Sequence, residues 1–287
     1  MPDSNFLKDQ VQTMTTKDCL DTDNDLFSSS LHGDVLILKQ KRHILHLSHD
    51  INKVQYFYDY LDSILNSNKF KAMIFFGESQ KEPMTEYIRF LCESMSSFQG
   101  KVYIYRLFNV FNRFITTLAS LNAVTVYVGR DHVSLFRLNI GLAYDYRILA
   151  EGTVFENLNA DIGLLTKGSG YFMPRLLGVK KTTEVLQWRT FSSEEALQLG
   201  LVDRIVPLDR LEEETLEFVK MHLQQQTSTF LAIRKLLKCD QQALKRSLDL
   251  EDELIKERLE APDFKHVFEK YCLTRFGKDV ETLLATG

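Results

Sequence analysis

Two short runs of uninterrupted apolar residues constrain the fold of this 287-residue chain more than any other feature. The first run, FKAMIFF, covers residues 70–76, and the second, AVTVYV, covers residues 123–128. Strands buried on both faces have this composition, because helices cover each side of a parallel sheet. Segments with apolar residues at helical spacing lie around these runs, at 53–65, 85–95 and 104–121. The alternation predicts an α/β domain with a mostly parallel sheet.

The remaining segments predict how this core is extended. Two apolar stretches within residues 34–47 favour a hairpin or two consecutive strands, and 134–144 and 146–149 favour a helix and a strand. A further helix is expected to begin at 168 and to stop at Gly178. In the segment 192–206 we expect a helix and then a strand, with Ser192 and Glu195 forming a capping box. Everything beyond Pro207 has a helical, charged pattern.

Composition excludes several classes of protein. Hydrophobic residues make up 44% and charged residues 26% of the chain, as in ordinary globular domains, and the net charge of −4 argues against a nucleic-acid partner. The four cysteines are far apart, the first ten residues lack the apolar core of a signal peptide, and no run reaches the length of a membrane span. We therefore expect a cytoplasmic protein with free thiols and a polar N-terminal arm over residues 1–33.

The stretch from Asp145 to Pro207 resembles the crotonase superfamily, which includes the enoyl-CoA hydratase/isomerase family. Its most specific match is ALQLGLV at 196–202, followed by DRIVP. The resemblance implies an α/β fold of the ClpP/crotonase type, a spiral of β-β-α units with a C-terminal helical extension. It assigns residues 34–207 to the crotonase-like core and residues 208–287 to a helical trimerisation or lid region.

The resemblance also implies a chemistry. Family members bind acyl-CoA thioesters, stabilise an enolate-like oxyanion with two backbone N–H groups, and move protons with one or two carboxylates. They are usually trimers or dimers of trimers. For this chain the resemblance implies acyl-CoA as ligand, no separate cofactor or metal, and a homotrimer, a hexamer or co-assembly with an active homologue.

Several residues depart from the family pattern where the chemistry is done. When the sequences are aligned on Asp145, the two catalytic glutamates fall at Asn139 and Asn159, and an amide cannot act as a general base. The glycines of the oxyanion turn fall at the segment 135–137, which reads Leu-Phe-Arg. Near the second backbone donor the small-residue turn is replaced by a segment that contains Met84. The alignment thus assigns substrate contacts to Met84, Phe136, Arg137 and Gly168.

Three other residues are candidates for catalysis. Glu156 and Asp161 lie close to Asn159 and could serve as a base, although a solvated or loop-capping role is the plainer interpretation. Lys167 precedes a glycine-rich helix start, where an amine could pair with an anion or react if desolvated. Its plainer interpretation is a surface lysine at a helix N-terminus.

Two further clusters are not expected to form sites. His43, His46 and His49 are spaced by three, so a strand would place them on both faces, and only Asp50 accompanies them. Asp131, His132 and Ser134 contain the residue types of a hydrolase triad, but near-adjacent residues on one turn do not converge as a triad requires.

Two hypotheses for function remain. We expect a crotonase-fold protein that has lost standard catalysis and acts as an acyl-CoA-type binding, structural or regulatory subunit. The alternative is an active hydratase/isomerase-type enzyme, a lyase, isomerase or hydrolase, that uses Glu156, Asp161 or Lys167. Arg137 favours the alternative, because its guanidinium could replace the missing N–H donors and hold an anion.

Overall fold

A computed structural model of the chain describes residues 20–78, 83–96, 98–224, 227–237 and 240–277. Within these ranges, seven strands form the main sheet: β1 (Thr22–Asp23), β2 (Phe27–His32), β3 (Val35–Gln40), β4 (Ala72–Phe76), β5 (Val124–Gly129), β7 (Tyr146–Ala150) and β10 (Arg204–Val206). They lie side by side in this order. β1, β2 and β3 pair antiparallel, and every pairing from β3 to β10 is parallel. The parallel α/β core predicted from the apolar runs is confirmed.

A second, smaller sheet carries the turn that the sequence singled out. It consists of β6 (His132–Ser134), β8 (Val154–Glu156) and β9 (Thr190–Ser192), with β8 in the middle. β6 pairs parallel with β8, so that Ser134 lies opposite Glu156. This pairing fixes the end of β6, from which the next helix begins.

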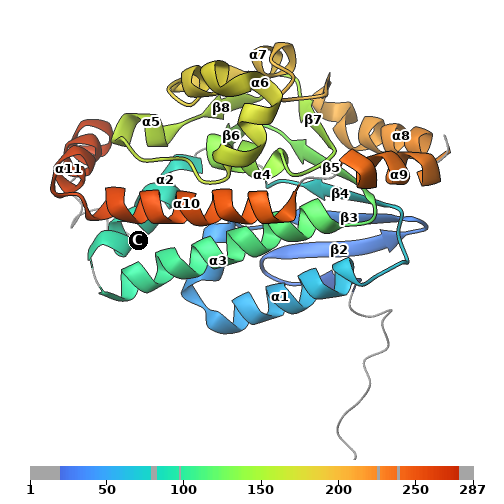
Figure 1. Ribbon diagram of the computed structural model, residues 1–287, viewed down its shortest axis with the longest axis horizontal. Helices are drawn as coiled ribbons and strands as arrows, with labels where there is room; N and C mark the ends of the chain where they lie inside the picture. The colour runs from blue at the N-terminus through green and yellow to red at the C-terminus, as the bar shows by residue number, and fades with distance from the viewer. Residues whose placement is uncertain (1–19, 79–82, 97, 225–226, 238–239, 278–287) are drawn as a thin grey trace, which may run out of the picture.

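The helices surround the two sheets and fill the C-terminal third of the chain (Figure 1). They are η1 (Ile44–His49), α1 (Ile51–Leu65), α2 (Pro83–Ser96), α3 (Phe98–Ser120), α4 (Leu135–Gly141), α5 (Leu158–Ile162), α6 (Ser169–Val185), α7 (Ser193–Gln198), η2 (Leu208–Arg210), α8 (Leu211–Gln224), α9 (Thr227–Leu237), α10 (Gln241–Glu260) and α11 (Pro262–Phe276). The helical extension beyond Pro207 is therefore confirmed. None of the helices in the described ranges combines the length and the apolar character needed to cross a bilayer.

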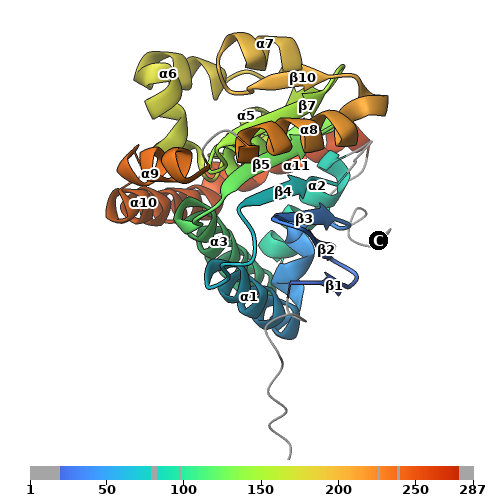
Figure 2. The same cartoon turned by 90° about the vertical axis from the view of Figure 1, so that its right-hand side faces the viewer.

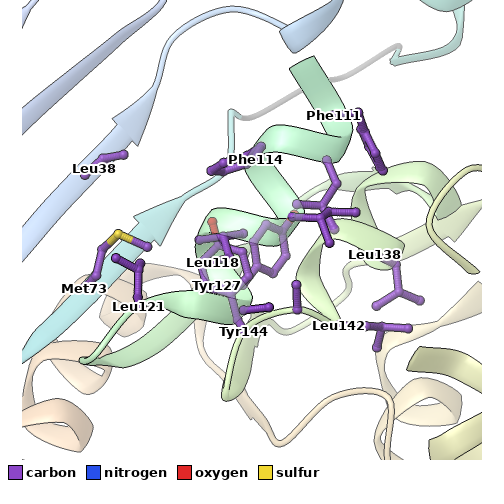
Figure 3. Packing of buried hydrophobic residues seen from close by; sticks show 14 of the residues in the cluster. Leu38, Met73, Phe111, Phe114, Leu118, Leu121, Tyr127, Leu138, Leu142 and Tyr144 are labelled. Carbon is purple, nitrogen blue, oxygen red and sulfur yellow. The ribbon is translucent and has the colours of Figure 1, made fainter. Parts of the chain in front are cut away.

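Helices cover both faces of the main sheet, as its continuous apolar strands require. α1, α3 and α4 pack on one face, where Phe114, Tyr127 and Leu138 belong to the largest core cluster (Figure 3). α8 covers the other face (Figure 2). Its buried residue Val219 belongs to a core cluster with apolar residues of the strands. The helix α10 lies alongside α3 and also contacts α6, so it closes the molecule over the end of the site described below (Figure 1).

Two predictions about the N-terminal part are wrong. Residues 34–47 do not form the hairpin, because β3 pairs instead with β2 and residues 44–49 form the 3-10 helix η1. The polar arm predicted for residues 1–33 is wrong for residues 20–33, since they contain β1 and β2; residues 1–19 lie outside the described part. Three consecutive serines, at residues 28–30, make up the middle of β2, and Phe27 is its only buried apolar residue, which hid the strand among polar letters.

Two local predictions about helices hold. The capping box of Ser192 and Glu195 at the start of α7 is confirmed by both of its hydrogen bonds. The helix that begins at Ser169 is interrupted at Gly178, whose φ of 73° is left-handed, and the chain then resumes a helical course to Val185. Glycine adopts this conformation without the steric cost that a side chain would add.

Candidate functional site

The turn that leads into α4 lies at the carboxyl edge of the parallel strands, where ligands bind in open α/β sheets. Ser134 caps the helix, and its Oγ accepts the Arg137 N–H at 3.3 Å. One of the backbone donors of this turn is therefore already satisfied within the turn. Leu135 is buried, and Phe136 is half-buried with its ring centroid 4.5 Å from that of Phe111.

Arg137 forms a buried ion pair with Glu78, the second residue after β4. The pair forms because β4 and β5 are neighbouring parallel strands, so the segments that follow them meet at one edge of the sheet. The guanidinium Nη2 binds the Glu78 carboxylate, and Nη1 donates to the Glu78 carbonyl at 3.2 Å. Burial lowers the pKa of Arg137 to about 9, so the guanidinium is still cationic at neutral pH.

His43 also packs against Phe136, with nearly parallel rings at a centroid distance of 6.3 Å. It is buried, and its Nδ1 accepts the Leu45 N–H at 3.2 Å to cap η1. Burial, and then the nearby charges of Arg137 and His46, hold the pKa of His43 well below its usual range. His43 is therefore a neutral capping residue at neutral pH.

This shift predicts a loss of stability in acid. The unfolded chain protonates at the ordinary histidine pKa while folded His43 stays neutral, so stability should fall as the pH drops below about 6.5. Between pH 7.5 and 5.5 the contribution of His43 should be about 1.4 kcal/mol. Urea unfolding at the two pH values would measure it, with His43→Asn, which can still cap η1, as the comparison. Equal pH dependence in the two proteins would contradict the assignment.

The two asparagines at the glutamate positions brace one loop. Asn139 Nδ2 donates to the Lys167 carbonyl at 2.9 Å, and Asn159 Nδ2 donates to the Leu165 carbonyl at 2.8 Å. Both side chains are buried. An ionised carboxylate only accepts hydrogen bonds and could not donate to these carbonyls, so the amides suit this loop where acids would not. The Tyr87 hydroxyl bonds to Asn159, and burial raises the pKa of Tyr87 to about 12.

Lys167 is not the surface lysine that the plainer interpretation expected. Its side chain is 3% exposed, and Nζ lies 2.7 Å from Asp252 Oδ1 and 3.7 Å from Glu251 Oε2. Nζ also donates to the Leu248 carbonyl at 2.6 Å. All three partners belong to α10, because this helix lies across the loop that precedes α6.

The N-terminus of α6 is filled by the same helix. Gly168 and Gly170 donate their N–H groups to the Glu251 carboxylate at 2.7 and 2.6 Å, which suits the positive end of the helix dipole. Gly168 has a φ of 85°, and a Cβ there would lie 3.2 Å from both Asn139 Cβ and Phe111 Cε1. Burial raises the pKa of Glu251. The position assigned to substrate contact at Gly168 thus binds a side chain of this chain.

The remaining candidates are distributed over this region. Glu156 Oε1 lies within hydrogen-bond distance of His132 Nδ1, at 2.9 Å, and Glu156 lines a small cavity with Asn159 and Phe136. Asp161 pairs with Arg189 at 2.7 Å and does not line that cavity. Met84 lies in the first turn of α2, and its side chain lies outside the described part of the structure.

The small cavity at this site has a volume of only about 20 Å³ as bounded by the described residues. That is room for about one water molecule. Leu135, Phe136 and the loop at 157–159 occupy the surrounding space. The cavity that the described residues enclose is therefore too small for a thioester group.

The other clusters from the sequence form no site in the described ranges. No group of three or more potential metal ligands gathers there, and His49 instead pairs with Glu93 at 2.9 Å. Of the triad residue types, His132 pairs with Glu156 and Ser134 caps α4.

Glu78, Glu251 and Asp252 were missed as site residues. Glu251 and Asp252 lie in α10 between Leu248 and Ile255, and all four are buried. Helical periodicity places these acidic residues on the apolar face of α10, and this pattern could have indicated from the sequence that they are buried. Glu78 gives a weaker signal, because many residues that follow a buried strand are acidic and exposed.

Comparison with known proteins identifies the fold. The family model described as enoyl-CoA hydratase/isomerase matches residues 138–276. The enoyl-CoA hydratase from Bacillus halodurans superposes with a TM-score of 0.73 at 21% identity, over 85% of this chain and 99% of that one. The enoyl-CoA hydratase from Mycobacterium avium subsp. paratuberculosis gives 0.68 at 18% identity, over 87% and 96%. An enoyl-CoA hydratase/isomerase from Pseudoalteromonas atlantica gives 0.67 at 17% identity, over 87% and 97%.

Proposed function

We propose that this chain, which matches the enoyl-CoA hydratase/isomerase family model over residues 138–276 and has the crotonase fold, is a catalytically degenerate member of that family. It acts as an acyl-CoA-type binding, structural or regulatory subunit. The observation that carries this proposal is the buried Arg137–Glu78 pair, which occupies the turn where the family places an oxyanion. A guanidinium already neutralised by an internal carboxylate is not available to a developing oxyanion.

The rest of the site supports the same proposal. Catalysis by oxyanion stabilisation needs donors directed into a space that the reacting oxygen can enter. Here the Arg137 N–H is bonded to Ser134, and the adjoining cavity has room for about one water molecule. Proton transfer needs a titratable group, whereas Asn139 and Asn159 are amides bonded to loop carbonyls.

The proposal extends to assembly. The chain would form a homotrimer or hexamer, or join an active homologue, and contribute its helical C-terminal region to the contacts. We place it in the cytoplasm on the grounds of its composition and family. An acyl-CoA ligand would then be held chiefly through its CoA part, because the acyl end of the site is filled.

One observation favours an active enzyme instead. Glu156 lines the small cavity beside Asn159 and is joined to His132, an arrangement that can hold and release a proton. In that hypothesis Glu156 is the acid or base, and side-chain movement opens the cavity. Lys167 and Asp161 are weaker candidates, since both are engaged in ion pairs.

Turnover and binding assays on the purified protein test the proposal. With crotonyl-CoA and longer enoyl-CoA thioesters we expect no turnover above that of the Glu156→Gln variant, and a raised unfolding temperature with CoA or acyl-CoA. Turnover that Arg137→Ala or Glu156→Gln abolishes would establish the active enzyme. If no thioester raises the unfolding temperature, acyl-CoA binding is excluded and only the structural role of the proposal is left.

A further inference from the structure

We propose that a second, apolar cavity, on the opposite side of the α4 turn, binds the tail of a short aliphatic carboxylate whose charged end lies at Arg42. This cavity has a volume of about 60 Å³ and lies between α1, α3, η1 and the strands β2 to β5. Its wall is made mainly of Leu38, Leu47, Phe57, Phe114 and Tyr127. Figure 3 shows Leu38, Phe114 and Tyr127 within the same part of the core.

The apolar cavity is separate from the small one at the asparagines. Arg137 and Ile140 line the apolar cavity, whereas Ser134, Leu135 and Phe136 line the small one. The first turn of α4 therefore stands between the two, and His43 is the one residue that both share. Binding in the apolar cavity does not depend on the proposed function.

The composition of the wall favours an aliphatic ligand over water. A buried water needs two to four polar partners, which a wall of leucine and phenylalanine side chains does not offer. The Tyr127 hydroxyl is the exception, as it is buried and has no hydrogen-bond partner among the described residues. The cavity is well below the roughly 150 Å³ that holds a benzene ring, so a narrow chain of a few carbons fits it best.

The charge at the mouth selects a carboxylate. The polar residues of the lining are Gln40, Arg42, His43 and Arg137. Arg137 is engaged by Glu78, and His43 is held neutral by burial. Arg42 is exposed and forms no ion pair within the described ranges, where the nearby Asp25 is paired with Lys53, so the Arg42 guanidinium can bind an anion. Charge-assisted hydrogen bonds of this kind are the stronger ones.

Hexanoate is a suitable probe, with hexylamine as its matched cation of similar length. We expect hexanoate to raise the unfolding temperature and to show NOEs from its methyl group to the rings of Phe57, Phe114 and Tyr127. Arg42→Gln should weaken hexanoate binding on the order of tenfold. The control Lys180→Gln removes an exposed cation of α6 outside the lining and should change nothing.

The outcomes separate the parts of the proposal. Ile44→Phe adds bulk at a half-buried position of the wall and should abolish the NOEs while the protein stays folded. Equal stabilisation by hexanoate and hexylamine would overturn the carboxylate selection. No shift and no NOEs at about 10 mM hexanoate would overturn the site, because a ligand with a Kd of ~1 mM would be largely bound. Saturating CoA should not displace hexanoate, which distinguishes this site from the proposed CoA-binding one.

Discussion

Lys167→Met is expected to lower the free energy of unfolding by about 3–5 kcal/mol, since it leaves buried carboxylates without their cation. Methionine fills similar space, so packing changes little, but Glu251 and Asp252 lose the ammonium group that lies between α10 and the loop before α6. Denaturant unfolding followed by circular dichroism measures the change. Burial already raises the pKa of Glu251, and removal of Lys167 should raise it further.

The direction of the pH effect follows from that shift. A carboxyl whose pKa is higher in the folded than in the unfolded protein stabilises the fold less as the pH rises. The deficit of Lys167→Met relative to the natural protein should therefore shrink as the pH is lowered toward about 5. Adding Asp252→Asn should recover part of the loss, since it removes the carboxylate nearest to Nζ. A loss below about 1 kcal/mol would mean that solvent reaches the cluster.

Arg137→Met should have a comparable effect, about 3 kcal/mol or more, because it leaves the Glu78 carboxylate buried beside an apolar side chain. The matched double variant Arg137→Met/Glu78→Met removes both charges together. It should recover most of the loss, since apolar residues of similar volume often replace buried ion pairs at little cost. Denaturant unfolding of the two single variants and the double variant gives the coupling energy.

The same double variant bears on function. If the ion pair only closes the oxyanion position, the apolar pair should fold and still lack turnover. Additive losses, with no recovery in the double variant, would show that Arg137 and Glu78 act independently and would weaken the argument that one neutralises the other.

Much of the fold could be predicted from the sequence, because the buried strands are continuous apolar runs and several helices show clear periodicity or a cap. β4, β5 and the capping box of α7 lie where the apolar runs and Ser192 predict them. β2 was missed because four of its six residues are serine or histidine. η1 was mistaken for a strand because two turns of 3-10 helix are too short to show a clear periodicity. The pairing of β3 with β2, rather than with a strand at residues 44–47, determined both outcomes.

The site was harder to predict because its partners are distant in sequence. The sequence identified the turn at 135–137 and Lys167, but it gave no means to pair Arg137 with Glu78 or Lys167 with α10. Periodicity describes which face of an element is buried, and it does not identify the element that will cover it. The sequence alone therefore does not distinguish a buried lysine from one on the surface.

The dependence of Lys167 on α10 has a consequence for how the protein is made. A ribosome delivers the chain from its N-terminus, so Lys167 is synthesised well before Glu251 and Asp252. Until α10 follows, burying this lysine would leave a cation without a counter-charge, which is strongly unfavourable. The loop before α6 and the start of α6 should therefore stay open on nascent chains and close only after the acidic turn of α10 has emerged. Burial of Lys167 therefore has to await the synthesis of α10, because this helix supplies both carboxylates that pair with the ammonium group.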